Sequence, residues 1–306
     1  MKVKLLGLGA VGAPLAALIH DHCDFSIILD DERKIRYAKD GQIVNDVKYN
    51  FNIAEDNFET DLIILGCKNF HLEEAIELIK PFVNENTIIL SLLNGVSSEK
   101  ELAKHYKREN IFHGYFVGMS SVHIGNTTVC SGEWKVVYGQ EDNVKSERLL
   151  AIDAMFKEAG VLTVLPEDIH HEIWWKFLLN TCFNSLSAAM GLNYDMIKDN
   201  ENLFNAVRLC ANEVVLVAKA EGILLTEDDV NRTIEAMNRL TGEGKTSMLQ
   251  DMDAARKTEN DYFTKYVSEL GKKHNIKTPY CDFVYSLVGA KEYAQSKWEN
   301  STSWMY

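Results

Sequence analysis

Apolar residues follow two different patterns along the chain, and the change falls near Pro166. In the first part, short apolar runs rich in β-branched residues alternate with segments of helical spacing. These runs predict strands at residues 3–6, 25–29, 61–65 and 87–92, with helices at 14–19 and 72–79. Strands that alternate with helices form βαβ units, so the pattern predicts a parallel sheet.

The next region is also rich in β-forming residues, but glycines interrupt it. It runs from residue 112 to residue 138, and its glycines are Gly114, Gly118, Gly125, Gly132 and, just beyond it, Gly139. We interpret it as the later, less regular strands of the same sheet.

Beyond Pro166 helix-forming residues dominate. Candidate helices span residues 168–190, 201–221, 227–240, 253–274 and 280–296. Gly222 and Pro279 separate neighbouring helices, because both residue types interrupt helical patterns. A chain of 306 residues is also longer than one hydrophobic core usually supports. The sequence therefore predicts an α/β domain at residues 1–166 and an all-α domain at residues 167–306.

Charge and hydropathy exclude two classes of partner. The formal net charge is −13, and so acidic a chain repels phosphate backbones, which argues against nucleic acid. No apolar stretch reaches the roughly 18 residues that would span a membrane. The N-terminal run is interrupted by lysines and glycines and does not resemble a signal peptide. We expect a cytoplasmic protein that acts on a small molecule.

Cysteine and histidine spacing predicts no metal site. The chain has six cysteines, and none form a C-x-x-C pair. His113 is most simply a strand residue, while His170 and His171 fit the start of a helix.

The motif Gly7-x-Gly9-x-x-Gly12 follows an apolar strand and opens a helix. In a dinucleotide-binding turn, the first glycine permits the tight turn and the second lets the backbone approach the pyrophosphate. The third lets the helix pack on the strand, and the helix N-terminus offers N–H groups to the phosphates. Asp30 ends the next strand 18 residues after Gly12, near the usual place of the ribose-binding acid. The sequence thus predicts a Rossmann-type domain whose cofactor-binding residues are Gly7, Leu8, Gly9, Ala10, Val11, Gly12 and Asp30.

Residues 173–190 are apolar on most sides but carry one polar stripe. Lys176, Asn180 and Asn184 are spaced by four residues, so they project from one side of a helix with a drift of about 40° per step. A solvated helix face is usually built from Glu, Lys, Gln or Arg, and asparagine is a poor helix former. The stripe therefore favours the wall of a cleft over a solvent-exposed face.

This helix resembles the central helix of the ketopantoate reductase (2-dehydropantoate 2-reductase) family. The motif is Ile173-Trp174-x-Lys176-x-x-x-Asn180-x-x-x-Asn184-x-Leu186-x-Ala188. The similarity covers nearly the whole chain. It includes the glycine-rich loop, Cys67-Lys68, Leu93-Asn94-Gly95-Val96, Ser247-Met248-Leu249-Gln250-Asp251 and Arg256-x-Thr258-Glu259-x-Asp261.

The resemblance implies a role for each matching residue. Lys176 would be the general acid that protonates the oxygen of the reduced ketone, and Glu259 would orient the substrate beside it. Asn180, Asn184 and Ser247 would hold the substrate's hydroxyl and carboxylate. Asn94 would position the reacting carbonyl and the cofactor, and Lys68 would contact cofactor or substrate. The implied substrate is the 2-keto acid 2-dehydropantoate, and the product is (R)-pantoate.

Two opposing effects act on the predicted acid. An apolar helix would lower the pKa of Lys176 toward working pH, as a proton donor requires, whereas a nearby carboxylate such as Glu259 would raise it. The sequence leaves the balance open. Arg256 and Asp261 are better interpreted as surface charges of a helix.

The sequence departs from the family pattern at three places. Ser185 stands where many relatives have proline, and Asn260 and Phe263-Thr264-Lys265 replace an apolar residue and an Asn-Gly pair. These departures bear on the substrate rather than on the reaction class.

The family pattern and the residues of this chain predict different cofactors. Family members commonly use NADPH, but Asp30 would bind both ribose hydroxyls of NADH and repel a 2′-phosphate. Arg33, Lys34 or Arg36 could offset that repulsion, or could simply begin the next helix. We weigh the direct contact more and predict that NADH serves at least as well as NADPH.

Two alternative functions stay open from the sequence. One is a reductase of another 2-keto acid, such as a related hydroxyacid or opine dehydrogenase. The other is a catalytically inactive NAD(P)-sensing protein, which the presence of Lys176, the asparagine pair and Glu259 disfavours. A homodimer is compatible with either function.

Overall fold

The computed structural model describes residues 1–55 and 59–302, with side chains as far as Lys297. The chain forms two compact units, Met1–Ile173 and Trp174–Tyr306. The α/β unit comes first and the helical unit second, which confirms the predicted fold class.

Seven strands of the N-terminal unit form one sheet in the order β11-β10-β7-β6-β5-β1-β2. The five strands from β2 to β7 are parallel, β10 is antiparallel to β7, and β11 is parallel to β10. The strands are β1 (Lys2–Leu6), β2 (Asp24–Ile28), β5 (Leu62–Leu65), β6 (Ile88–Ser91), β7 (Ile111–Val117), β10 (Lys135–Gln140) and β11 (Leu162–Val164). The four predicted parallel strands correspond to β1, β2, β5 and β6, each within one residue at either end.

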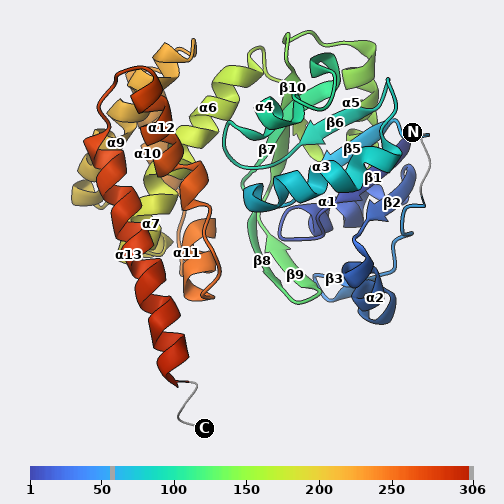
Figure 1. Ribbon diagram of the computed structural model, residues 1–306, viewed down its shortest axis with the longest axis horizontal. Coiled ribbons are helices and arrows are strands. Elements are labelled where there is room, and N and C mark those ends of the chain that lie inside the picture. The colour runs from blue at the N-terminus through green and yellow to red at the C-terminus, as the bar shows by residue number, and fades with distance from the viewer. Residues whose placement is uncertain (56–58, 303–306) are drawn as a thin grey trace. The chain divides into compact units, whose positions relative to one another are not determined.

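Successive residues of a buried strand point to opposite faces of the sheet. Ile64 of β5 lies in an apolar cluster with α1 (Gly12–Ile19) and α5 (Glu147–Glu158). Its neighbours Ile63 and Leu65 lie in a second cluster with α3 (Leu72–Ile79) and α4 (Ser98–Leu102). Burial of each such side chain contributes about 1.5–3 kcal/mol to folding, so helices on both faces are needed to cover this sheet. Figure 1 shows the strands with these helices.

A second, four-stranded sheet has the order β4-β3-β9-β8. Its strands are β3 (Gln42–Val44), β4 (Val47–Tyr49), β8 (Ser120–Ile124) and β9 (Thr127–Ser131). The prediction that all strands of residues 112–138 join the main sheet is therefore wrong for β8 and β9. The chain leaves that sheet at Gly118 (φ +83°) and returns at Gly132 (φ +94°), two left-handed positions that favour glycine. Between them the residues of β8 alternate between exposed and half-buried, so this strand cannot fill a sheet covered on both faces.

The remaining helices of the N-terminal unit are short connecting elements. They are α2 (Asp31–Asp40) and three single 3₁₀ turns, Asn69–His71, Lys80–Phe82 and Arg108–Asn110.

The C-terminal unit is helical in the part that the structure describes, as predicted. Helix α6 (Ile169–Leu179) starts in the N-terminal unit and leads through a π-helical turn (Asn180–Asn184) into α7 (Ser185–Met190). The other helices are α8 (Tyr194–Ile197), α9 (Glu201–Ala220), α10 (Glu227–Asn238), α11 (Ser247–Asp253), a 3₁₀ turn (Asn260–Tyr262), α12 (Thr264–Lys273) and α13 (Pro279–Thr302). Helix α13, red in Figure 1, packs against α7, α9 and α12.

The predicted single helix at residues 253–274 is wrong. Helix α11 ends at Asp253, and Ala255 adopts a left-handed conformation with φ +49°. The backbone N–H of Arg256 then bonds to the carbonyl of Asp251, which closes the end of α11. Helix α12 begins only at Thr264, so the segment with Glu259 is a connection between helices and not part of one.

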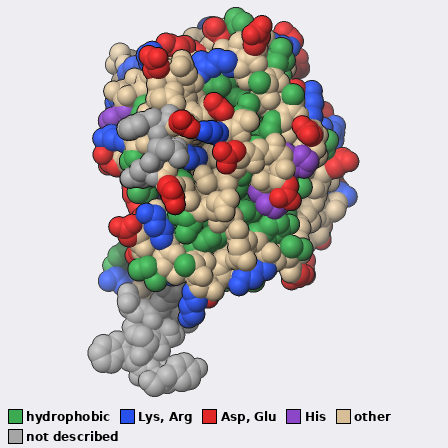
Figure 2. Space-filling model, turned by 90° about the vertical axis from the view of Figure 1, so that its right-hand side faces the viewer, with side chains coloured by type: hydrophobic (Ala, Val, Ile, Leu, Met, Phe, Trp, Pro, Cys, Tyr) green, Lys and Arg blue, Asp and Glu red, His purple; other side chains and the backbone are tan. Residues whose placement is uncertain are grey.

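Among residues 1–55 and 59–302, no helix is both long and apolar enough to cross a bilayer. On the face drawn in Figure 2, acidic and basic side chains are interspersed rather than gathered by sign.

Candidate active site

The glycine-rich loop follows β1 at the point where the strand order reverses. Strand β1 pairs with β2 on one side and β5 on the other, and such switch points are where nucleotides bind in open α/β sheets. Gly7 has φ +106°, and a Cβ there would lie 2.6 Å from the carbonyl carbon of Gly66. A Cβ on Gly12 would lie 2.0 Å from the carbonyl oxygen of Gly7. Both positions therefore require glycine for the close approach of backbone to backbone.

Gly9 has a different environment, which fits a bound dinucleotide. An added Cβ would meet no described atom within 4 Å, so the backbone here faces open space rather than protein. Leu8, Ala10 and Val11 are half-buried beside it, and α1 starts at Gly12. The Ser121 hydroxyl of β8 donates to the Ala10 carbonyl at 2.7 Å and supports the loop. Sequence reasoning missed Ser121, because it lies 111 residues away in a strand without a motif.

Asp30 follows β2 and caps the N-terminus of α2. Its Oδ1 accepts from the backbone N–H of Arg33 at 2.7 Å, and its Oδ2 lies 3.2 Å from Nη1 of Arg33. Asp31 and Glu32 belong to the exposed first turn of α2. The carboxylate of Asp30 thus already has a cationic neighbour, Arg33, one of the residues that could offset its repulsion of a 2′-phosphate.

The loops after β5 and β6 are joined at the C-terminal edge of the sheet. Lys68 precedes the 3₁₀ turn that follows β5, and Asn94 follows β6. The buried Asn69 donates from Nδ2 to the carbonyl of Asn94 at 2.7 Å. Gly95 has φ +101°, so the loop turns sharply directly after Asn94. Asn69 was missed by sequence reasoning, although its position next to Lys68 was a usable signal.

The two asparagines of the polar stripe are buried and bonded to each other. Asn180 and Asn184 begin and end the π-helical turn, a feature that is frequent at functional sites. The Nδ2 of Asn184 lies 3.3 Å from Oδ1 of Asn180 and 3.2 Å from Oγ of Ser247. Ser247 is the first residue of α11, whose N-terminus Thr246 caps. The fold therefore brings together three of the four predicted substrate-binding residues.

Lys176 lies in the last turn of α6, one turn before Asn180. Its neighbours Trp175 and Phe177 are buried, and Lys176 itself is partly buried. Burial lowers the pKa of the Lys176 ammonium to about 8, because loss of hydration penalises the charged form. Loss of hydration is the cause that acts on this pKa, so of the two effects that the sequence left open, burial is the one expressed in the fold. A lysine with this pKa can donate a proton near neutral pH.

Glu259 is buried in the connection between α11 and α12. The backbone N–H of the preceding Thr258 donates to Oε1 of Glu292 in α13 at 2.9 Å, and Glu259 accepts from Tyr262 through its carbonyl. Glu292 thus holds the backbone next to Glu259. Glu292 could not be predicted from the sequence, since it lies 34 residues from Thr258 in a charged stretch of α13.

The two charges interpreted as surface residues are paired. Arg256 donates from Nε to Oδ1 of the buried Asp251 at 3.0 Å. Asp261 accepts from the Tyr285 hydroxyl at 3.0 Å and lies 3.3 Å from Nζ of Lys265. These pairs tie the connection around Glu259 to α11, α12 and α13.

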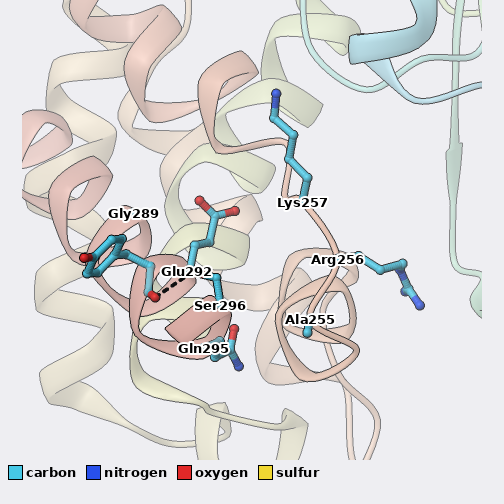
Figure 3. Close-up of a pocket in the computed structure, with 8 residues that line it drawn as sticks. Ala255, Arg256, Lys257, Gly289, Glu292, Gln295 and Ser296 are labelled. Carbon is cyan, nitrogen blue, oxygen red and sulfur yellow. Dashed lines mark hydrogen bonds between the residues drawn. The ribbon is translucent and has the colours of Figure 1, made fainter. Parts of the chain in front are cut away.

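A pocket of about 390 Å³ lies between this connection and α13. Its lining residues are Ala255, Arg256, Lys257, Gly289, Glu292, Tyr293, Gln295 and Ser296. Figure 3 shows Lys257 and Glu292 extending toward the top of the view from the connection and from α13. Glu292 thus both lines the pocket and holds the backbone beside Glu259.

Comparisons with known proteins match both halves of the chain. The family model described as "Ketopantoate reductase PanE/ApbA" matches residues 3–142, and "Ketopantoate reductase PanE/ApbA C terminal" matches residues 168–292. The chain is 28% identical over 312 residues to the 2-dehydropantoate 2-reductase of Lactococcus lactis subsp. lactis, covering 95% of this chain and 98% of that protein.

Solved structures add two further likenesses. A D-mandelate dehydrogenase with NADH and anilino(oxo)acetate has a TM-score of 0.86 and 27% identity, covering 96% of this chain and 99% of that one. A dimeric ketopantoate reductase from Staphylococcus aureus has a TM-score of 0.80, covering 96% and 99%; at 21% identity this likeness shows the fold alone. Because the two family matches together span most of the sequence, and fall on the regions with the glycine-rich loop and the polar stripe, the chain belongs to the ketopantoate reductase family.

Proposed function

We propose that this protein reduces 2-dehydropantoate to (R)-pantoate, a step toward pantothenate and coenzyme A, with a reduced nicotinamide dinucleotide as hydride donor. The homologues indicate an NAD(P)-dependent 2-keto acid oxidoreductase, and the proposal adds the substrate. The observation that carries it is the buried pair Asn180 and Asn184, bonded to the exposed Ser247, one turn beyond a lysine whose pKa is lowered to about 8.

The glycine-rich loop would hold the dinucleotide. The open space beside Gly9 leaves its backbone free to approach a pyrophosphate, and the N-terminus of α1 offers N–H groups and positive dipole to the phosphates. Asp30 would bind the adenine ribose, and Lys68 and Asn94 would act at the nicotinamide end. When bound, the nicotinamide supplies the hydride that reduces the ketone carbon.

The polar stripe would bind the keto acid and protonate it. Lys176 would donate its proton to the ketone oxygen as negative charge builds there, and its cation would stabilise that charge before transfer. Asn180, Asn184 and Ser247 would bind the substrate's hydroxyl and carboxylate through the polar atoms that now bond one another. The buried Glu259 would orient the substrate.

Reduction of another 2-keto acid is the second candidate, and one observation favours it. The similar D-mandelate dehydrogenase acts on an aryl hydroxy acid and was solved with NADH. Two of the departures from the family pattern have defined places in the fold. Asn260 is buried, bonding the carbonyl of Tyr285 and the hydroxyl of Thr264, and Ser185 continues the helix after the π turn.

A comparison of keto acids separates the two candidates. Steady-state rates should be measured with 2-dehydropantoate, 2-ketoisovalerate, pyruvate, oxaloacetate and benzoylformate, the keto acid that corresponds to mandelate. We expect 2-dehydropantoate to have the highest kcat/KM. A clearly higher value for benzoylformate would assign the protein to the second candidate, and no turnover of any of them would favour a sensing role.

The proposed assembly is a homodimer. The S. aureus reductase of the same fold is dimeric. Exposed apolar side chains stand on α9 (Leu209 and Leu216) and on α13 (Phe283 and Leu287), and self-association would remove such surface from water. The six cysteines, all free thiols, suit the reducing cytoplasm as the proposed compartment.

A further inference from the structure

Three side chains of the N-terminal unit that the proposed reaction does not use lie together. His113 belongs to β7, Glu141 directly follows β10, and His170 is the second residue of α6. One ring nitrogen from each histidine and one carboxylate oxygen all lie within 4.8 Å of one another. The sequence predicted no metal site because about 28 residues separate each of these side chains from the next.

The three residues of the group already contact one another. His113 Nε2 lies 2.8 Å from Oε2 of Glu141, and His170 Nε2 lies 2.7 Å from the Glu141 carbonyl oxygen. The two imidazole rings stand edge to face with centroids 4.9 Å apart. The side chain of His113 is 9% exposed and that of Glu141 is 32% exposed, so a small ion could enter beside Glu141 and meet a buried imidazole.

A second carboxylate stands behind His113. Glu99 Oε1 lies 4.0 Å from Nδ1, the ring nitrogen that does not face Glu141. Glu99 is buried and accepts from the Ser98 hydroxyl at 3.0 Å, and Ser98 is in turn bonded to Ser91 at 2.9 Å. At 4.0 Å this carboxylate acts on the imidazole through its charge, from the side where histidines that bind metal ions often have a carboxylate partner.

The local charge also suits a cation. Glu99 and Glu141 carry two negative charges, and Arg108 supplies one positive charge at 2.8 Å from Oε1 of Glu141. With neutral imidazoles the group has a net charge of about −1. Arg108 is mostly exposed and pairs with Oε1 of Glu141, whereas Oε2 faces Nε2 of His113, so Arg108 competes with an incoming ion from the other carboxylate oxygen.

We propose that His113, Glu141 and His170 bind one divalent ion of the Zn²⁺ class. Two imidazoles and one carboxylate are a common Zn²⁺ ligand set that leaves a fourth position for water. Imidazole ligands favour Zn²⁺, Ni²⁺ or Cu²⁺ over Mg²⁺ and Ca²⁺, which prefer all-oxygen sites. Bonds of about 2.1 Å place ligand atoms about 3.4 Å apart, so the 2.8 Å contact between His113 and Glu141 opens on binding, while separations of up to 4.8 Å close.

The bound ion would stabilise the first turn of α6. It would connect that turn, through His170, to β7 and the end of β10. Lys176 lies six residues beyond His170 on the same helix. The site is separate from the reduction chemistry, and its test needs no turnover.

Calorimetric titration of the metal-free full-length protein with ZnCl₂, and thermal unfolding with and without ZnCl₂, test the proposal. We expect one ion per chain and a higher melting temperature. His170→Gln should abolish both, whereas His171→Gln, at the next position and outside the group, should change neither. Glu99→Gln should weaken binding about 10–100-fold, as loss of a carboxylate behind a ligand usually does. Arg108→Gln should strengthen it.

Cobalt distinguishes these ligands from the thiols. Co²⁺ bound at this site should give visible bands without the near-ultraviolet charge-transfer band of a thiolate, and His170→Gln should remove them. Binding that persists in His170→Gln, or that shows the thiolate band, would overturn the assignment. So would the absence of 1:1 binding by the wild-type protein.

Discussion

Nδ2 of Asn184 donates to Oγ of Ser247 at 3.2 Å, across 63 residues of sequence. This bond connects the π-helical turn to the N-terminus of α11 and aligns two residues that the proposal assigns to one substrate. Ser187 and Thr246 form a parallel link, with their hydroxyl oxygens 3.0 Å apart. Both pairs join the central helix to the N-terminal end of α11, and they hold the polar stripe in place before the substrate binds.

Truncation of this pair should impair substrate use. Asn184→Ala and Ser247→Ala should each raise the KM for the keto acid and lower kcat/KM, by about tenfold for each 1.4 kcal/mol of lost binding. The double variant should lose less than the product of the two effects, because the residues share one network. Ser286→Ala, which removes an exposed hydroxyl on α13, is the matched control. If the KM changes of the two single variants instead multiply in the double variant, the two residues act separately.

Loss of Lys176 should affect chemistry rather than cofactor binding. Lys176→Ala should lower kcat by about 10²–10⁴, the range for a lost general acid. The dissociation constant of the reduced dinucleotide, measured by fluorescence, should stay near the wild-type value. The exposed Lys198 in the same unit supplies the control Lys198→Ala. A near-normal kcat for Lys176→Ala would end the assignment of this residue as the acid.

The rate of reduction should fall at high pH, because the proposed mechanism requires a protonated acid. Burial lowers the pKa of Lys176 to about 8, so the ammonium is present below that pH and is lost above it. The kcat/KM for reduction should therefore be flat below pH 8 and fall as pH rises through 8. Oxidation of the product requires the neutral amine and should show the opposite trend. Identical profiles in both directions would exclude Lys176 as the titrating group.

The burial of Lys176 also lowers the free energy of unfolding. Its pKa is near 8 in the folded protein and near 10.5 in the unfolded chain, so the unfolded chain binds more protons between these values. The free energy of unfolding should therefore rise with pH from 8 to 10.5. Below pH 8 the full cost of burying the charged ammonium should apply. Lys176→Met should raise the melting temperature at pH 7 while abolishing reduction, and this gain should shrink by pH 10. A lower melting temperature for Lys176→Met at pH 7 would contradict this account.

Cofactor choice should depend on Asp30. We expect NADH to be used at least as well as NADPH, because a carboxylate at this position binds ribose hydroxyls and repels a 2′-phosphate. Asp30→Ser is the informative variant, since serine retains the N-cap of α2 while removing the charge. It should lower kcat/KM for NADH and raise it for NADPH. The exposed Asp31 supplies the control Asp31→Ser.

The ion pair between Arg33 and Asp30 gives the competing outcome a physical basis. If Arg33 binds the 2′-phosphate, the wild-type protein should strongly prefer NADPH and Arg33→Ala should remove that preference. Asp30→Ser would then leave the ratio unchanged.

Local patterns determined the architecture of the first unit and the elements that surround the site. Strands β1, β2, β5 and β6 could be predicted because their apolar runs are short, continuous and bounded by breakers. Gly7 and Gly12 could be predicted because only glycine satisfies their backbone contacts. The stripe of Lys176, Asn180 and Asn184 followed from helical spacing alone.

Tertiary structure decided what sequence spacing does not encode. The departure of β8 and β9 into a second sheet and the break before Glu259 depend on left-handed backbone positions and long-range pairing. The bond from Asn184 to Ser247 and the grouping of His113, Glu141 and His170 join residues that are distant in the chain. The lowered pKa of Lys176 likewise reflects loss of water around the ammonium, and only the packed fold determines how much water is excluded.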